Sequence, residues 1–191
     1  EMKSIIVDIA DKKLLVTAEF LPVTDLSGKN ILCYQTSARF FEYSEQPTLP
    51  RPVEITCAQP PGVDDFIFTT LCQLAKKKET LCFSFTLPPQ RLNDSDYLAT
   101  LHHLCTSNDV AAERIEIVLD KRIAHEDLQQ SLPFLREIKA CGFMLGLHNR
   151  AEHLLQSRDS EWQSLFPAVK GYALPHALTL SQLQLWEDLS S

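Results

Sequence analysis

The segment Leu81-Cys82-Phe83-Ser84-Phe85-Thr86-Leu87 has the length and the apolar character of a buried β-strand. Two more short apolar strands follow it along the chain, Ile115-Glu116-Ile117-Val118-Leu119 and Phe143-Met144-Leu145-Gly146-Leu147. Helical patterns separate them, and the alternation predicts βα units and a largely parallel sheet. Right-handed crossovers at each unit would curl such a sheet towards a (β/α) barrel.

The spacing of apolar residues predicts three helices around these strands. The first is expected to start at Asp64, interpreted as its cap, and the second at Asn93 or Asp94. The third is expected to end at Gly142, a residue suited to terminate a helix. Their buried stripes are predicted at Ile67, Leu71, Leu74 and Ala75; at Tyr97, Leu98, Leu101, Leu104 and Cys105; and at Leu128, Leu132, Leu135 and Ile138.

The segments before and after these units differ in character. Two β-branched runs within residues 4–20 flank a polar turn at Asp11-Lys12-Lys13, which predicts a β-hairpin, and another strand is expected at 31–40. The proline-rich stretch 44–62 has no clear period and predicts an irregular connection. Beyond the third strand we expect helical structure over 151–166. The sequence then predicts a strand near Val169–Leu174 and a last helix from Thr179.

Composition limits the classes of function. With 191 residues we expect one domain over 1–191, with the alternative that it belongs to a longer protein. A net charge of −7 argues against binding to nucleic acid, because such a protein needs a basic face. No apolar run approaches the roughly 20 residues that span a bilayer, so membrane insertion is not expected. Six cysteines spaced singly predict a reduced, cytoplasmic protein.

The order of the elements and several local motifs resemble an EAL domain, the family of cyclic di-GMP phosphodiesterases. The matches follow the order of the family motifs over residues 14–174. The segments that carry the resemblance are Phe20–Asp25 (family Gln-Pro-Ile-Val-Asp), Gln35–Phe40 (Glu-Ala-Leu-x-Arg-Trp), Phe85–Leu92 (Val-Asn-Leu-Ser-Pro-x-x-Leu), Ile115–Lys121 (Leu-Glu-Leu-Glu-Ile-Thr-Glu), Cys141–Ala151 (Leu-Gly-Val-x-Leu-Ala-Ile-Asp-Asp-Phe-Gly) and Lys170.

The resemblance implies where two catalytic cations would be held, and other residues occupy those positions here. The Glu of the family's name motif falls on Gln35, its ligand Asn on Thr86, and a ligand Glu on Val118. The family's Asp pair falls on His148 and Asn149. Mg²⁺ needs oxygen ligands, mostly anionic. The resemblance therefore predicts no phosphodiesterase activity, no catalytic residue, no metal site and no cofactor.

Two functional residues of the family are kept. Arg39 falls on its phosphate-contacting Arg, and Lys170 on the Lys of a later strand. Arg39 suits bidentate recognition of a phosphate, although a surface salt bridge explains a single arginine equally well. Against nucleotide binding, the position of the family's Gln carries Leu21. The resemblance predicts that cyclic di-GMP binds weakly or not at all.

These observations favour a non-catalytic regulatory module that acts through a protein partner or by self-association. The alternative is a cyclic di-GMP receptor that binds the nucleotide without hydrolysis. A full barrel of this kind has about 250 residues, so we expect an incomplete or modified TIM-like (β/α) barrel with an N-terminal β-hairpin. The contact with a partner is expected on the side of that hairpin, Ile5–Val16.

Overall fold

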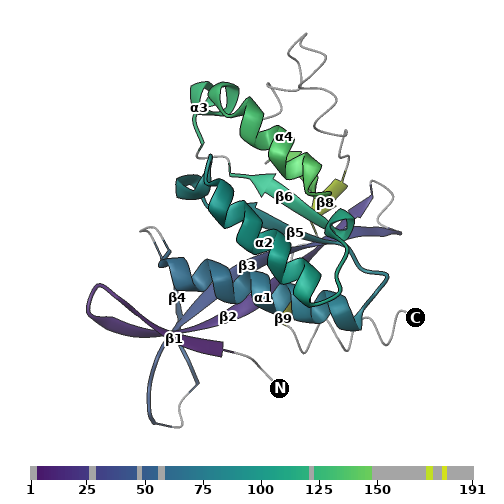
Figure 1. Ribbon diagram of the computed structural model, residues 1–191. Coiled ribbons are helices and arrows are strands. Elements are labelled where there is room, and N and C mark those ends of the chain that lie inside the picture. Colours follow the sequence, from purple (N-terminus) through teal and green to yellow (C-terminus); the bar gives the residue numbers. More distant parts are fainter. Residues whose placement is uncertain are drawn as a thin grey trace.

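The computed structural model describes residues 4–25, 29–46, 49–55, 59–120, 123–147, 171–173 and 178–179. They form a mixed α/β fold in which helices lie along a sheet (Figure 1). The elements, in chain order, are β1 (Ser4–Ile9), β2 (Lys12–Asp25), β3 (Ile31–Glu42), β4 (Pro52–Val53), α1 (Pro61–Lys77), β5 (Phe83–Leu87), the 3₁₀ turn η1 (Pro89–Arg91), α2 (Ser95–Ser107), η2 (Ala112–Arg114), β6 (Ile115–Leu119), α3 (His125–Gln130), α4 (Leu132–Ala140), β7 (Met144–Leu147), β8 (Gly171–Ala173) and β9 (Leu178–Thr179).

The sheet combines an antiparallel part with a parallel part. Its main path runs in the order β1-β2-β3-β5-β6-β7. The pairs β1–β2 and β2–β3 are antiparallel, whereas β3–β5, β5–β6 and β6–β7 are parallel. The predicted hairpin and the predicted parallel βα units are therefore both confirmed. β4 adds to β3, and β8 and β9 add to β2.

The hairpin turn lies earlier than the sequence predicts. Ile9 pairs directly with Lys12, so the loop consists of Ala10 and Asp11, and both have positive φ angles of 50° and 64°. Two-residue hairpin loops need this left-handed geometry, because it matches the twist of the flanking strands. The prediction of a turn at Asp11–Lys13 followed polarity, but Lys12 and Lys13 already belong to β2.

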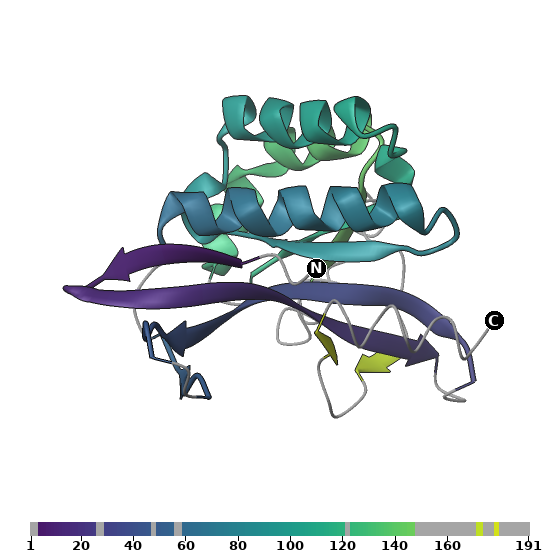
Figure 2. The same cartoon turned by 90° about the horizontal axis from the view of Figure 1, so that it is seen from below.

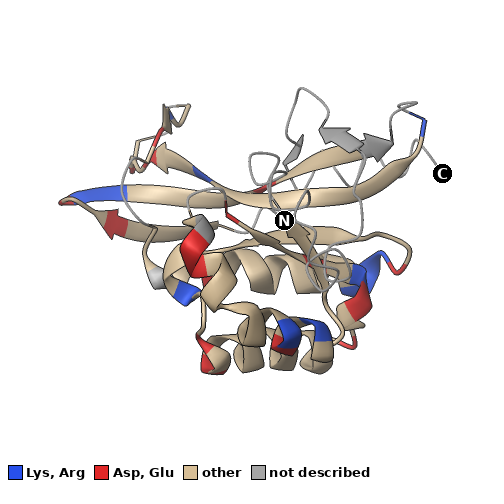
Figure 3. Cartoon of the chain, turned by 90° about the horizontal axis from the view of Figure 1, so that it is seen from above, with Lys and Arg blue, Asp and Glu red and all other residues tan. Residues whose placement is uncertain are grey.

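The helices cover one face of the sheet, here called the helix face (Figure 2). α1 packs against β2, β3 and β5, and α4 packs against β7, with α2 between the two helices. Apolar side chains of the strands fill this interface: Tyr34, Phe83, Phe85, Leu87, Ile115, Ile117, Leu119 and Leu145 are at most 3 % exposed. Acidic and basic residues concentrate on helices, turns and strand ends (Figure 3).

The starts of the first two helices test the predicted caps. Asp94 is the N-cap of α2 as expected, and its Oδ1 accepts a hydrogen bond from the Tyr97 amide at 3.0 Å. The prediction for α1 is wrong, because that helix already begins at Pro61. Proline suits a first helical turn, since its missing N–H would have no partner there. Asp64 consequently lies inside the first turn and is only 9 % exposed.

The predicted third helix is two helices. α3 ends at Gln130, and α4 begins at Leu132, with Ser131 between them. Pro133 follows at the second position of α4 and has no N–H to bond to the preceding turn, which interrupts a continuous helix. The predicted buried positions Leu128, Leu135 and Ile138 are nevertheless buried.

The C-terminal predictions are tested only in part. The strand expected near Val169–Leu174 is present as β8. Thr179, expected to start a helix, instead belongs to β9, where Leu178 pairs with Phe20. The helix expected over 151–166 lies outside the described residues. In the described part of the chain, no helix combines the length and the hydropathy needed to cross a bilayer.

Candidate functional site at the strand ends

A cavity of about 520 Å³ lies where the carboxyl end of β5 meets the middle of β3 and the start of α1. Because β3, β5 and β6 are parallel, their carboxyl ends share one edge of the sheet, the usual place for a ligand in such folds. The described residues that line the cavity are Thr36, Ser37, Ala38, Ile55, Gln59, Asp64, Ile67, Phe85, Thr86, Pro88, Pro89, Gln90 and Asp120.

Three positions at which the resemblance places metal ligands lie on the face of the sheet away from the helices, here called the opposite face. Thr86 pairs directly with Val118, and Gln35 lies one row away, paired with Ser84. The structure therefore brings Gln35, Thr86 and Val118 onto one surface of three neighbouring strands. A hydroxyl, an amide and a hydrocarbon supply no anionic oxygen for a divalent cation. His148, Asn149 and Lys170 lie outside the described residues.

Within the described ranges, no group of three or more His, Cys, Asp or Glu side chains could hold a metal ion. Glu116 is nevertheless a carboxylate on the opposite face, and burial raises its pKa. Burial, and next the charge of Glu116, raise the pKa of Cys33 to about 12, while a hydrogen bond with Ser84 opposes the shift. Gly146 leaves room for Glu116, because a Cβ at Gly146 would lie 2.8 Å from the Glu116 carboxyl.

Arg39, the candidate phosphate ligand, has partners within the protein. Its Nη1 lies 2.7 Å from Oε1 of Glu19 on the neighbouring strand, and its guanidinium lies 5.2 Å from the ring centre of Phe41. The side chain is 43 % exposed, and Arg39 does not line the cavity. The structure thus separates Arg39 from the strand-end cavity and gives it an ion pair.

Asp64 is a site residue that sequence reasoning placed wrongly. As part of the first turn of α1, it lines the cavity instead of capping the helix from outside. Burial, and next the neighbouring Asp65, raise the pKa of Asp64 to about 6, and Arg91 partly offsets this. The signal in the sequence was Pro60-Pro61, which fixes the helix start ahead of Asp64.

The fold, but not the sequence, resembles that of known proteins. No protein-family model matches the chain, and no curated protein sequence matches it. Solved structures with a similar fold include EAL domains. The chain therefore has a mixed α/β fold that matches EAL-type TIM-barrel structures, with an antiparallel N-terminal strand pair and a parallel sheet.

Three of these structures show how far the likeness extends. The PaMucR phosphodiesterase, solved with cyclic di-GMP, gives a TM-score of 0.61 at 8% identity over 88% of this chain and 99% of that chain. The EAL enzyme Bd1971, bound to cAMP and cyclic di-GMP, gives 0.58 at 14% identity over 74% of this chain and 43% of that one. The EAL domain of Mycobacterium smegmatis DcpA gives 0.55 at 9% identity over 74% and 61%. This chain thus spans less than two thirds of two of these structures.

Proposed function

We propose that residues 1–191 form one degenerate EAL domain that acts in cyclic di-GMP-type signalling as a non-catalytic regulatory module. In this proposal the domain works by contact with a protein partner or with a second copy of itself. The EAL-type fold supports the signalling context. Gln35, Thr86 and Val118 support the loss of catalysis, because at these three positions the opposite face presents an amide, a hydroxyl and a hydrocarbon instead of carboxylates.

The observation that carries the proposal is a row of apolar residues across four strands. Ile6 on β1 pairs with Leu15 on β2, Leu15 pairs with Phe41 on β3, and Phe41 pairs with Pro52 on β4. Directly paired residues point to the same face of a sheet. We call Ile6, Leu15, Phe41 and Pro52 the apolar strip.

The apolar strip lies on the side of the sheet away from the core. On the same strands, Val16 and Phe40 point to the core and are at most 5 % exposed, whereas Ile6 is 51 % exposed. The four residues of the strip are uncharged, and the Arg39 guanidinium borders them, 5.2 Å from the ring centre of Phe41. An apolar row with a polar border is typical of a protein contact site. β1 is also an edge strand, since in the described part of the chain it pairs with β2 alone.

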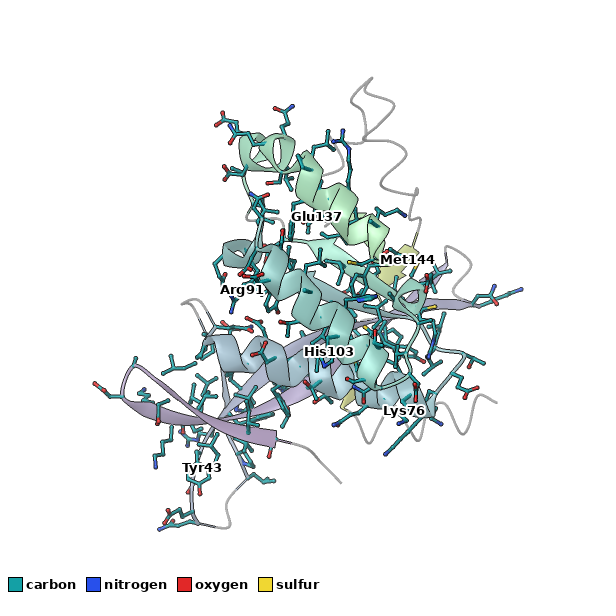
Figure 4. All side chains as sticks on the ribbon, viewed as in Figure 1. Tyr43, Lys76, Arg91, His103, Glu137 and Met144 are labelled. Carbon is teal, nitrogen blue, oxygen red and sulfur yellow. The ribbon has the colours of Figure 1, made fainter. Side chains whose placement is uncertain are left out.

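The surroundings of the apolar strip extend the same surface. The Tyr43 amide donates a hydrogen bond to the Lys13 carbonyl at 3.1 Å, so the chain after β3 stays beside the hairpin (Figure 4). Tyr43 is 37 % exposed, and Leu49 in the same connection is 93 % exposed. Tyrosine is among the residues that most often anchor protein contacts.

The same proposal includes a modified barrel. Support comes from β2, whose edge away from β3 is paired with β1, β9 and β8 in succession. The N-terminal hairpin therefore occupies a position beside strands from the C-terminal part of the sequence. Such an arrangement leaves β1 at the periphery, where a partner can reach it.

The test compares Ile6→Lys with Leu32→Lys. Both residues are exposed apolar side chains on the same sheet, at 51 % and 43 %, but Leu32 does not belong to the apolar strip. We expect Ile6→Lys to weaken self-association, measured by light scattering, or capture of a protein partner, by roughly tenfold or more, because a buried unpaired charge is costly. Leu32→Lys should behave as the wild type. The proposal fails if Ile6→Lys associates as strongly as Leu32→Lys does.

The structure also sharpens the choice of residue for this test. Ile5 and Val7 lie on the same strand as Ile6, but both are half-buried and pack on the core. Charges there would unfold the hairpin and give an uninformative loss of binding. Ile6 avoids this, because its side chain points away from the core.

The alternative function, a cyclic di-GMP receptor, would depend on Arg39 and Lys170. The ion pair of Arg39 with Glu19 at 2.7 Å supports a structural role instead. Calorimetry with cyclic di-GMP separates the two functions. A dissociation constant below about 10 μM that is lost in Arg39→Ala would favour the receptor over the protein-contact module.

A further inference from the structure

The strand-end cavity has the size and the lining of a small-molecule site. Its volume of about 520 Å³ lies within the range of roughly 300–1,000 Å³ that is usual for such sites. Its polar lining includes the hydroxyls of Thr36, Ser37 and Thr86 and two carboxylates, Asp64 and Asp120. None of the described lining residues is Lys, Arg or His. The fixed charge that this lining presents to a ligand is therefore negative.

Asp64 is the central group, because it is buried and lacks a strong partner. It is 9 % exposed, and among the described residues no hydrogen bond reaches its carboxylate. The charge of Arg91 acts on Asp64, but its guanidinium is held elsewhere: it donates to Oδ2 of Asp94 at 3.0 Å and lies 4.6 Å from the ring centre of Tyr97. Figure 4 shows Arg91 beside the start of α2. The start of α1 supplies only a partial positive charge.

A buried polar atom close to Asp64 is unpaired. The Tyr97 hydroxyl is inaccessible and has no hydrogen-bond partner among the described residues, and Tyr97 as a whole is 6 % exposed. Burial, and next the charge of Asp64, raise the pKa of Tyr97, which places the two groups near each other. Folded proteins leave few buried polar groups unsatisfied, so the unpaired Tyr97 hydroxyl shows that the surroundings of Asp64 lack a hydrogen-bond partner.

We propose that this cavity binds a small organic cation, whose guanidinium or ammonium group donates hydrogen bonds to the Asp64 carboxylate. Such a group carries both the positive charge and the N–H donors that Asp64 lacks. A phosphate or a carboxylate ligand would meet the negative charges of the lining, and an apolar ligand would leave Asp64 unpaired. This site is independent of the apolar strip, so either proposal can fail without the other.

The experiment measures binding of n-butylguanidinium by titration calorimetry at neutral pH, with n-butylurea as an uncharged ligand of nearly the same shape. We expect n-butylguanidinium to bind with a dissociation constant of about 1 mM or tighter, and n-butylurea not to bind measurably. Asp64→Asn should weaken binding by about tenfold or more, because it removes a charge-assisted hydrogen bond. Asp65→Asn is the matched control: Asp65 is exposed, adjacent on α1 and equally charged, and its loss should change the affinity less than about twofold.

A second variant guards against misfolding of Asp64→Asn. Thr86 is exposed and lines the cavity, so Thr86→Lys should fold and place an ammonium where the ligand binds. It should abolish binding of n-butylguanidinium. Equal binding of n-butylurea, or equal losses in Asp64→Asn and Asp65→Asn, would overturn the proposal. Tighter binding of the peptide acetyl-Gly-Arg-Gly-amide than of n-butylguanidinium would assign the cavity to a basic side chain of a protein and likewise overturn it.

Discussion

The two faces of the central strands differ in burial and in the types of residue that they carry. On the helix face, Phe83, Ile115 and Ile117 are completely buried. On the opposite face of the same strands, Gln35 and Thr86 are exposed, and their neighbours mix polar and apolar types. A position on the helix face must be apolar and of the right volume, since interiors are closely packed. The opposite face is freer to vary, so its chemistry can change while the fold persists.

This difference between the two faces explains how the chain can have an EAL-type fold although its sequence is only 8% and 14% identical to those of two structures that share the fold. Burial on the helix face needs only apolar residues at alternate positions, and many sequences meet that demand. Gln35, Thr86 and Val118 face the other way. Substitutions at these three positions cost the core little, because none of the three contributes to the packing of helices on the sheet.

The largest expected effect tests the helix face directly. Phe83 is completely buried, and its ring centre lies 6.0 Å from that of Phe20 and 5.9 Å from that of Tyr34. We expect Phe83→Ala to lower the free energy of unfolding by about 3–5 kcal/mol, because it leaves a cavity. Thr86→Ala on the same strand should change it by less than about 0.5 kcal/mol. Urea denaturation measures both, and similar losses in the two variants would break the comparison.

A smaller effect is expected at Asp64, where the two faces meet at the cavity. Its pKa of about 6 in the folded state lies above the ordinary 3.8, so the folded state binds the proton more tightly than the unfolded chain. Stability should therefore fall as the pH rises from about 4 to 6, and the full penalty remains above that. We expect Asp64→Asn to raise the free energy of unfolding at pH 7.5 by about 1–2 kcal/mol, after allowance for screening by water in the cavity.

Urea denaturation from pH 4 to pH 7.5 checks this sign. Asp64→Asn should flatten the pH dependence in that window, whereas Asp65→Asn should reduce the slope only in part, because burial, the largest cause of the raised pKa of Asp64, remains. A carboxylate with a purely structural role would give the reverse result, since its loss would destabilise the protein at neutral pH. If Asp64→Asn stabilises the protein and also weakens cation binding, then Asp64 serves binding and lowers the stability of the fold.

The smallest expected effect concerns the opposite face. We expect Mg²⁺ or Mn²⁺ at micromolar concentration to leave the melting temperature unchanged, because a ligand raises it only by binding the native state. Cyclic di-GMP should not be hydrolysed in the presence of either metal. A rise of several degrees with Mn²⁺, or hydrolysis that a chelator abolishes, would show that the carboxylates of the chain assemble a metal site after all.

The sequence predicts the elements of the helix face well, because each depends on its own periodicity. The strands around Phe83, Ile115 and Met144 and the cap at Asp94 are all confirmed. Local patterns also contain the reasons for two errors. Pro133 interrupts a helix that apolar spacing alone makes continuous, and Pro61 starts α1 ahead of Asp64.

The functional surfaces were harder to predict, because they depend on register between distant strands. Ile6, Leu15, Phe41 and Pro52 form one row only once three strand pairings are known. The sequence shows none of these pairings directly, and a slip of one residue would turn Leu15 to the core. The cavity likewise joins residues of α1, β3 and β5 that share no local pattern.

Different stretches of β2 acquire their partners at different times during synthesis. Its pairing with β1 and β3 uses neighbouring segments, which leave the ribosome early. Glu19 pairs with Thr179, and Val23 pairs with Ala173, so this stretch of edge must wait until most of the chain has been made. Contacts between segments so distant in sequence form slowly. Until they form, the exposed edge can pair with another nascent chain, which makes this half of β2 the place where misassembly would begin.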